Sequence, residues 1–205
     1  MRIDKVATNY APIFGISLIL AGFYGLLPLW NSAIPENNDD TDSARDGSFL
    51  KISGKVDVSL RHADGTIEER HLDNLIVDSG LEGVASRIAP HDGSINPSSP
   101  YNYIALGTSG SGVSGDQTSL VSELPFSATY ARQQDTLASF VSSGPKQLIL
   151  SVTYGPAEAT GTISESGVFN AATGGDMMAR QAFSTINKGE GDSLTITWTI
   201  TLSSS

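Results

Sequence analysis

The chain of 205 residues contains no cysteine. Without thiols it can form no disulfide, no thiolate metal site and no cysteine nucleophile, so an exported domain must be held by its own core, by ions or by an oligomer. Histidine is scarce as well, at three residues, and no G-x-S-x-G elbow supplies a nucleophilic serine for one of them to activate. These shortages predict a protein that is not an enzyme, with no cofactor and no metal site.

The chain also has few positively charged residues. Twelve Lys and Arg residues stand against 22 Asp and Glu residues, which gives a formal net charge of −10 at pH 7. An acidic surface repels the phosphates of DNA and RNA. The composition therefore predicts no nucleic-acid partner.

One long apolar run is present, because residues 11–30 carry no charge. As a helix rising about 1.5 Å per residue, a run of this length spans roughly 30 Å, the thickness of a bilayer's hydrocarbon core. We therefore predict a transmembrane or protein-buried helix over residues 1–30. The predicted membrane-facing residues are Ile13, Phe14, Ile16, Leu18, Ile19, Leu20, Phe23, Leu26, Leu27, Leu29 and Trp30.

The flanks of this run predict its orientation. Arg2 and Lys5 precede it and acidic residues follow it, so the positive-inside tendency places the N-terminus inside and the C-terminal domain outside. The alternative is a secretory signal cleaved near Ala33. The apolar run exceeds the roughly 7–15 residues of a signal core, and Asn31 does not fit the small-residue rule for cleavage, which favours a retained anchor.

Residues 31–48 are polar and acidic and predict a flexible linker. Their aspartates lack the glycine and the distal glutamate of an EF-hand, so they do not predict a calcium loop. Residues 49–205 remain, enough for one ordinary domain.

Short stretches of alternating apolar and polar residues fill this domain, separated by Gly, Pro, Asn and Asp. This rhythm predicts a mainly β fold, an antiparallel β-sandwich or jelly-roll-like domain, with one short helix between Asp78 and Pro90. The predicted apolar face of that helix comprises Leu81, Val84, Ala85 and Ile88. The predicted strands cover residues 51–62, 66–77, 103–107, 127–132, 137–141, 147–154, 162–169, 177–183 and 193–203.

The last of these strands has the clearest pattern. Leu194, Ile196, Trp198, Ile200 and Leu202 form one face, and Thr195, Thr197, Thr199 and Thr201 form the other. The alternation predicts that Trp198 lies in the core. The threonine row is a candidate face for assembly with another subunit.

Three patterns that resemble catalytic or ligand motifs have simpler explanations. Gly110, Gly112 and Gly115 spell G-x-G-x-x-G, but no long helix follows them as a dinucleotide fold requires. Glu158 and Glu165 resemble a glycosidase pair, yet the first is predicted in a turn and the second at an outward strand position. His62 and His71 lie in the arms of a predicted hairpin as cross-strand neighbours.

Several short stretches, taken together and in order, resemble a β-rich domain of tailed-phage fibres and related virion structural proteins. The resemblance covers about residues 70–203. It is carried by residues 74–81 (NLIVDSGL), 103–108 (YIALGT), 161–170 (GTISESGVFN), 178–180 (MAR), 186–188 (INK) and 194–200 (LTITWTI). It implies a non-enzymatic, oligomeric structural or attachment module.

Phage fibre proteins do not ordinarily begin with a membrane anchor. The combination predicts a structural protein in a virion membrane or cell envelope, whose partners are the lipid bilayer, copies of itself and neighbouring virion or envelope proteins. The alternative is an adhesin that binds a receptor or glycan through exposed loops such as 91–102 and 108–117.

Overall fold

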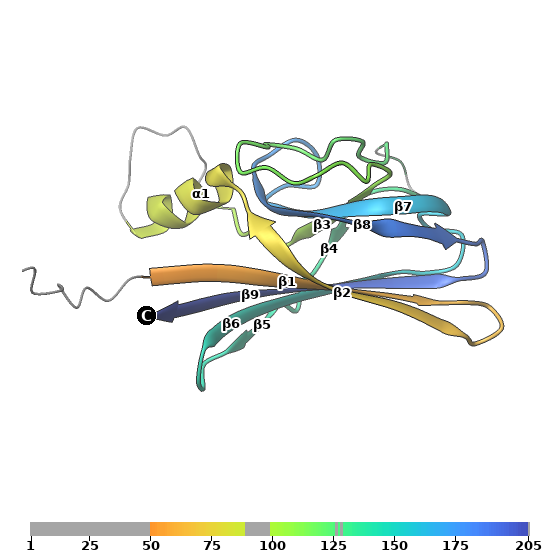
Figure 1. Cartoon of the computed structure of the whole chain (residues 1–205), viewed down its shortest axis with the longest axis horizontal. Coiled ribbons are helices and arrows are strands. Elements are labelled where there is room, and N and C mark those ends of the chain that lie inside the picture. The colour runs from red at the N-terminus through yellow and green to blue at the C-terminus, as the bar shows by residue number, and fades with distance from the viewer. Residues whose placement is uncertain (1–49, 89–98, 126, 128, 205) are drawn as a thin grey trace, which may run out of the picture. The chain divides into compact units, whose positions relative to one another are not determined.

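The computed structural model describes residues 50–88, 99–125, 127 and 129–204 (Figure 1). The predicted anchor at 1–30, with all its membrane-facing residues, and the predicted linker at 31–48 lie outside this part. Within the described ranges, no helix has the length and apolar character needed to cross a membrane.

The described residues are mainly β-strand, with one short helix, as the sequence predicts. The elements in chain order are β1 (Leu50–Arg61), β2 (Ile67–Ile76), α1 (Asp78–Ile88), β3 (Tyr103–Gly107), β4 (Gln133–Gln134), β5 (Ser139–Val141), β6 (Lys146–Tyr154), β7 (Gly161–Phe169), β8 (Met177–Lys188) and β9 (Ser193–Ser204).

The nine strands form one antiparallel sheet in the order β4-β3-β7-β8-β2-β1-β9-β6-β5. The sheet curls at β2. Most of this strand pairs with β1, whereas its last residues, Leu75 and Ile76, pair with Arg180 and Ala179 of β8. We call β2, β1, β9, β6 and β5 the large half-sheet, and β8, β7, β3 and β4 the small half-sheet; the two face each other in Figure 1.

The main core lies between the two half-sheets and contains the apolar side of β9. Trp198 is completely buried, which confirms its predicted position. Its indole Nε1 donates a hydrogen bond to Ser166 Oγ on the small half-sheet, at 3.3 Å. The alternation of β9 therefore predicts its register correctly, because only one face of this strand is packed into the core.

The small half-sheet is packed on both faces. Its inner face contacts the main core, and residues 108–122, which we call the covering loop, lie over its other face (Figure 1). Leu120 from this loop packs with Phe169 and Met177 in a second apolar cluster. Because both faces are covered, all residues from Ile163 to Phe169 of β7 are buried.

The predicted apolar face of α1 is wrong. Leu81 and Ile88 are 45% and 76% exposed and Ala85 is exposed too, while Val84 is half-buried. The helix instead buries Gly80, Gly83 and Ser86. It lies so close to its neighbours that only small residues fit: a Cβ atom built on Gly80 would lie 2.2 Å from the carbonyl oxygen of Met178.

This contact gives a test. Gly80→Ala is expected to destabilise the fold by about 1–3 kcal/mol, the usual cost of overpacking, because the obstructing atom is backbone and cannot rotate away. Chemical denaturation of the full chain measures the loss. The control is Glu82→Ala, at an exposed position of the same helix, which we expect to change stability by less than about 0.5 kcal/mol. Equal stability of the two variants would contradict the packing described.

Two further predictions of secondary structure need correction. Residues 127–132 do not form a strand where they are described: Ser127 Oγ accepts hydrogen bonds from the N–H groups of Thr129 and Tyr130, which makes a turn, and β4 begins only at Gln133. In the opposite sense, β8 continues to Lys188, beyond the predicted end at 183.

His62 and His71 are not cross-strand neighbours. In the β1–β2 register His71 stands opposite Asp57, and their side chains lie 2.6 Å apart (Nδ1 to Oδ1). His62 follows the end of β1 and contacts Asp192 at 3.2 Å (Nδ1 to Oδ2). Each imidazole therefore has a carboxylate partner of its own.

Candidate functional site

The outer face of the large half-sheet carries the predicted threonine row. Thr195, Thr197, Thr199 and Thr201 are all half-buried and alternate with the core residues of β9. Three of the four stand opposite polar side chains of β6, and Thr199 stands opposite Ile149. Thr197 Oγ1 lies 2.8 Å from Ser151 Oγ, and Thr195 Oγ1 lies 2.8 Å from Thr153 Oγ1. The structure thus arranges these hydroxyls as a ladder between two strands.

The same face of the sheet continues onto β1, the other neighbour of β9. The register places Ser53, Lys55, Asp57 and Ser59 opposite Thr201, Thr199, Thr197 and Thr195. On the far side of β9 it places Gln147, Ile149, Ser151 and Thr153 opposite the same four threonines. We call these twelve positions the hydroxyl face.

The hydroxyl face is electrically balanced. Its only charged positions are Lys55 and Asp57, which have opposite signs, whereas the chain as a whole carries −10. Neither β1 nor β6 shows a register shift against β9, so the three strands run side by side without a bulge. These twelve positions are regular and together neutral, and β2 continues the same face with Asp73, His71 and Glu69.

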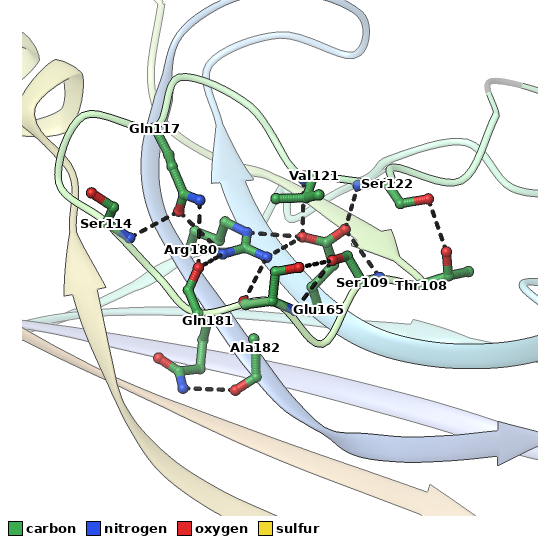
Figure 2. A network of polar contacts seen from close by, with 12 residues as sticks. Thr108, Ser109, Ser114, Gln117, Val121, Ser122, Glu165, Arg180, Gln181 and Ala182 are labelled. Carbon is green, nitrogen blue, oxygen red and sulfur yellow. Dashed lines mark hydrogen bonds and ion pairs between the residues drawn. The ribbon is translucent and has the colours of Figure 1, made fainter.

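A second polar arrangement lies beneath the covering loop. Glu165 of β7 and Arg180 of β8 are both completely buried, and Arg180 Nε donates to Glu165 Oε2 at 2.8 Å (Figure 2). The Glu165 carboxylate also accepts hydrogen bonds from the N–H groups of Ser122 at 2.7 Å and Val121 at 3.1 Å. One end of the covering loop is thereby held by this carboxylate.

Arg180 holds the middle of the same loop. Its guanidinium donates to the carbonyl oxygens of Gly112 and Ser111, at 3.0 and 3.2 Å. It also donates to Gln117 Oε1 at 3.1 Å (Figure 2). The buried charges therefore have both each other and several hydrogen bonds, the condition under which a buried ion pair is tolerated. We call Glu165 and Arg180 the loop-holding pair.

The sequence places Glu165 at an outward position, and this prediction needs refinement. The side chain does leave the small half-sheet on the side of the covering loop, but this loop buries it completely. Sequence reasoning also missed Arg180 as its partner. The single carboxylate of β7 and the single guanidinium of β8 are the only sequence signal for such a pair.

The covering loop contains the G-x-G-x-x-G pattern but no nucleotide-site geometry. The Gly112 carbonyl binds Arg180, and the Gly115 carbonyl accepts a hydrogen bond from the N–H of Asp78, at 2.8 Å. No helix follows the glycines in the described residues up to 125. The pattern thus serves to pack the loop onto the domain.

Other acidic and histidine groups occur in pairs at the ends or surfaces of strands. Glu158 lies in the turn predicted for it and accepts the N–H of Gly155 at 2.7 Å, so it does not share a site with Glu165. The hydrogen bond that His71 donates to the Asp57 carboxylate raises the pKa of His71. The N–H groups of Gly189 and Ala63, with His62, lower the pKa of Asp192. Among the described side chains, no group of three His, Asp or Glu could hold a metal.

No model of a known protein family matches the chain, and no curated protein is significantly similar to it. The geometry of the hydroxyl face and of the covering loop is therefore the basis for assigning a function.

Proposed function

We propose that this chain is a non-enzymatic structural protein of a virion or surface assembly. Residues 11–30 anchor it in a membrane, and its exported β-sandwich-like domain packs with copies of itself or with neighbouring shell proteins. The hydroxyl face is the proposed contact, and its neutrality within a chain of charge −10 is the observation that carries the proposal.

The charge distribution favours this face over the rest of the surface. Two copies of an acidic protein repel each other, and repulsion is weakest where the approaching surfaces have no net charge. On the hydroxyl face Lys55 and Asp57 cancel, and the remaining positions have hydroxyl, amide or apolar side chains. Copies can therefore approach most closely there.

The ladder also lowers the entropic cost of a contact. Thr195 and Thr197 are already fixed by hydrogen bonds to Thr153 and Ser151. Side chains that are ordered before association lose less conformational freedom when a partner binds. Anchoring of several copies in one membrane would raise their effective concentration further, so that a weak contact is sufficient.

A charge placed on the hydroxyl face tests the proposal. Thr197→Arg in the full chain is expected to weaken self-association in reconstituted vesicles at least tenfold. The change places a bulky charged side chain at the centre of the face, opposite Asp57, and gives the face a net charge. Energy transfer between fluorescently labelled copies, diluted with unlabelled lipid, measures association.

The matched control is Thr162→Arg, the same change at an exposed position of β7 outside the hydroxyl face. We expect it to associate as the parent chain does. If Thr197→Arg associates as strongly as Thr162→Arg, the hydroxyl face is not the contact.

A second candidate function is that of an adhesin. The observation in its favour is the covering loop, which exposes Ser111 and Ser114 while the loop-holding pair fixes its backbone. Recognition loops on rigid scaffolds are common in binding proteins. Binding of a glycan that is lost in Ser111→Ala but retained in Thr197→Arg would favour this function.

A further inference from the structure

At one end of the large half-sheet, the part of the chain that the structure describes leaves the inner face uncovered. The start of β1, the end of β9 and the start of β6 meet there, since Leu50 pairs with Ser204 and Leu202 pairs with Lys146. Together with α1, these strands border a groove of about 550 Å³. Figure 1 shows α1 and the first residues of β1 at this end of the domain.

The groove and its rim are mainly apolar. Leu148 and Leu202 line it from the strands and Val84 lines it from α1. At the rim Leu50 is 58% exposed and Ile88 is 76% exposed. We call Leu50, Val84, Ile88, Phe140, Leu148 and Leu202 the apolar end.

Phe140 extends this surface along the edge of the sheet. It is 62% exposed and stands opposite Leu148 in the β5–β6 register, so both side chains lie on the same face of the sheet. A scattered exposed apolar residue requires no explanation, but a contiguous apolar groove with exposed rims marks an interaction surface.

The point where residues 1–49 join the domain indicates which partner binds the apolar end. Leu50 is the first residue of β1, so residues 1–49 join the domain at the apolar end. Residues 31–49 span at most roughly 65 Å even when fully extended. If residues 11–30 lie in a bilayer, as the proposed function holds, the apolar end is the part of the domain tethered nearest to that bilayer.

Charge at the rim fits the same partner. Lys51 follows Leu50 and is exposed. Arg87 of α1 borders the groove and donates to the carbonyl oxygens of Gly83 and Ser99, and Lys146 begins β6 and donates to the carbonyl oxygen of Ser142. Lysine and arginine can lay their apolar stems on a hydrophobic surface while their charged groups reach lipid phosphates. Asp135, an acidic residue of the lining, already accepts hydrogen bonds from the N–H groups of Ser151 and Leu137.

We propose that the apolar end is a second membrane contact, which inserts into the interfacial layer of the lipid bilayer that holds the anchor. This inference rests on the proposed function. It also orients the domain, because β1, β9 and β6 each have one end at the membrane and extend away from it. The hydroxyl faces of neighbouring copies then meet in the plane of the membrane.

The absence of cysteine allows a site-specific test with the full chain. Ile88→Cys and Glu190→Cys are labelled with the same environment-sensitive fluorophore; Glu190 is exposed in the turn between β8 and β9, at the opposite end of the strands. Each protein is reconstituted in vesicles of phosphatidylcholine and phosphatidylglycerol, and quenching is measured with doxyl-labelled lipid and with iodide in the buffer.

We expect doxyl lipid to quench the label at 88 at least threefold more than the label at 190, and iodide to show the reverse order. Equal iodide quenching at both positions would overturn the inference. Protection of the label at 88 from both quenchers would overturn it as well, since protein and not lipid would then cover the apolar end.

Flotation of the vesicles separates this inference from the proposed function. A chain that does not float with the vesicles overturns both, because it has no membrane anchor. A chain that floats and self-associates, but whose label at 88 is fully open to iodide, overturns the second membrane contact alone.

Discussion

Replacing Arg180 with methionine is expected to destabilise the domain by about 3–5 kcal/mol, the range found when one partner of a buried ion pair is removed. Glu165 would remain as a buried carboxylate, with the N–H groups of Val121 and Ser122 but without its counter-charge. The covering loop would also lose the hydrogen bonds that Arg180 donates to the carbonyl groups of Ser111 and Gly112. Urea denaturation of the full chain, followed by Trp198 fluorescence in a Trp30→Phe background, measures the change.

Two variants distinguish the charge from the hydrogen bonds. Arg180→Lys retains the positive charge but lacks the planar fork, so we expect an intermediate loss and faster proteolysis within the covering loop. The double variant Glu165→Met, Arg180→Met removes both charges and is expected to be more stable than the sum of the single losses predicts. If Arg180→Met unfolds at the same urea concentration as the parent chain, the loop-holding pair does not stabilise the fold.

Trp198→Ala is expected to cost about 3–5 kcal/mol, as for other buried aromatic side chains that are cut to alanine. The indole is completely buried and bridges the two half-sheets through its hydrogen bond to Ser166. The variant leaves a large cavity at the centre of the main core and an unpaired hydroxyl on β7. Circular dichroism during thermal or urea unfolding measures the loss without the tryptophan signal.

The neighbouring threonine is the control for Trp198. Thr197→Ala changes the next residue of β9, whose side chain lies on the hydroxyl face, and should alter stability by at most about 1 kcal/mol, since it removes a single hydrogen bond at the surface. Trp198→Phe retains most of the apolar volume and should fall between the two. A Trp198→Ala variant as stable as Thr197→Ala would mean that the two faces of β9 are interchanged.

The sequence reveals most about strands with one packed face. The alternation of β9 identifies both Trp198 in the core and Thr197 outside it, because one side of this strand contacts the small half-sheet and the other does not. The same reasoning fails for β7, where the covering loop buries the second face as well. The periodicity of a strand indicates how many of its faces are packed against other regular elements. It gives no sign that a long irregular loop covers the remaining face.

Helix α1 illustrates a different failure. Leu81 and Ile88 form an apolar stripe at helical spacing, so the pattern assigns them to the core. The helix instead approaches β8 and Tyr101 through Gly80 and Gly83, where a larger residue would collide with Met178 or with the tyrosine ring. A close approach of two backbones requires residues without a Cβ atom. The spacing of apolar residues does not reveal such positions.

The loop-holding pair lies beyond reasoning from local sequence for a third reason. Glu165 and Arg180 meet because β7 pairs with β8, and a register shift after Ile163 adjusts the position of Glu165 within that pairing. Their other partners, Gly112 and Ser122, come from a segment more than forty residues away in sequence. The sequence shows both charged residues, but the strand topology determines which groups they contact.

The position of β1 in the sheet determines how the domain bears force. Leu50, where residues 1–49 join, begins a strand that lies between β9 and β2 and is in register with β9 along its whole length. A force applied to Leu50 along the axis of β1 acts in shear on the hydrogen bonds at both sides of this strand at the same time. An edge strand pulled at its end would instead peel away bond by bond. The domain therefore offers a mechanically resistant attachment point to the residues that precede Leu50.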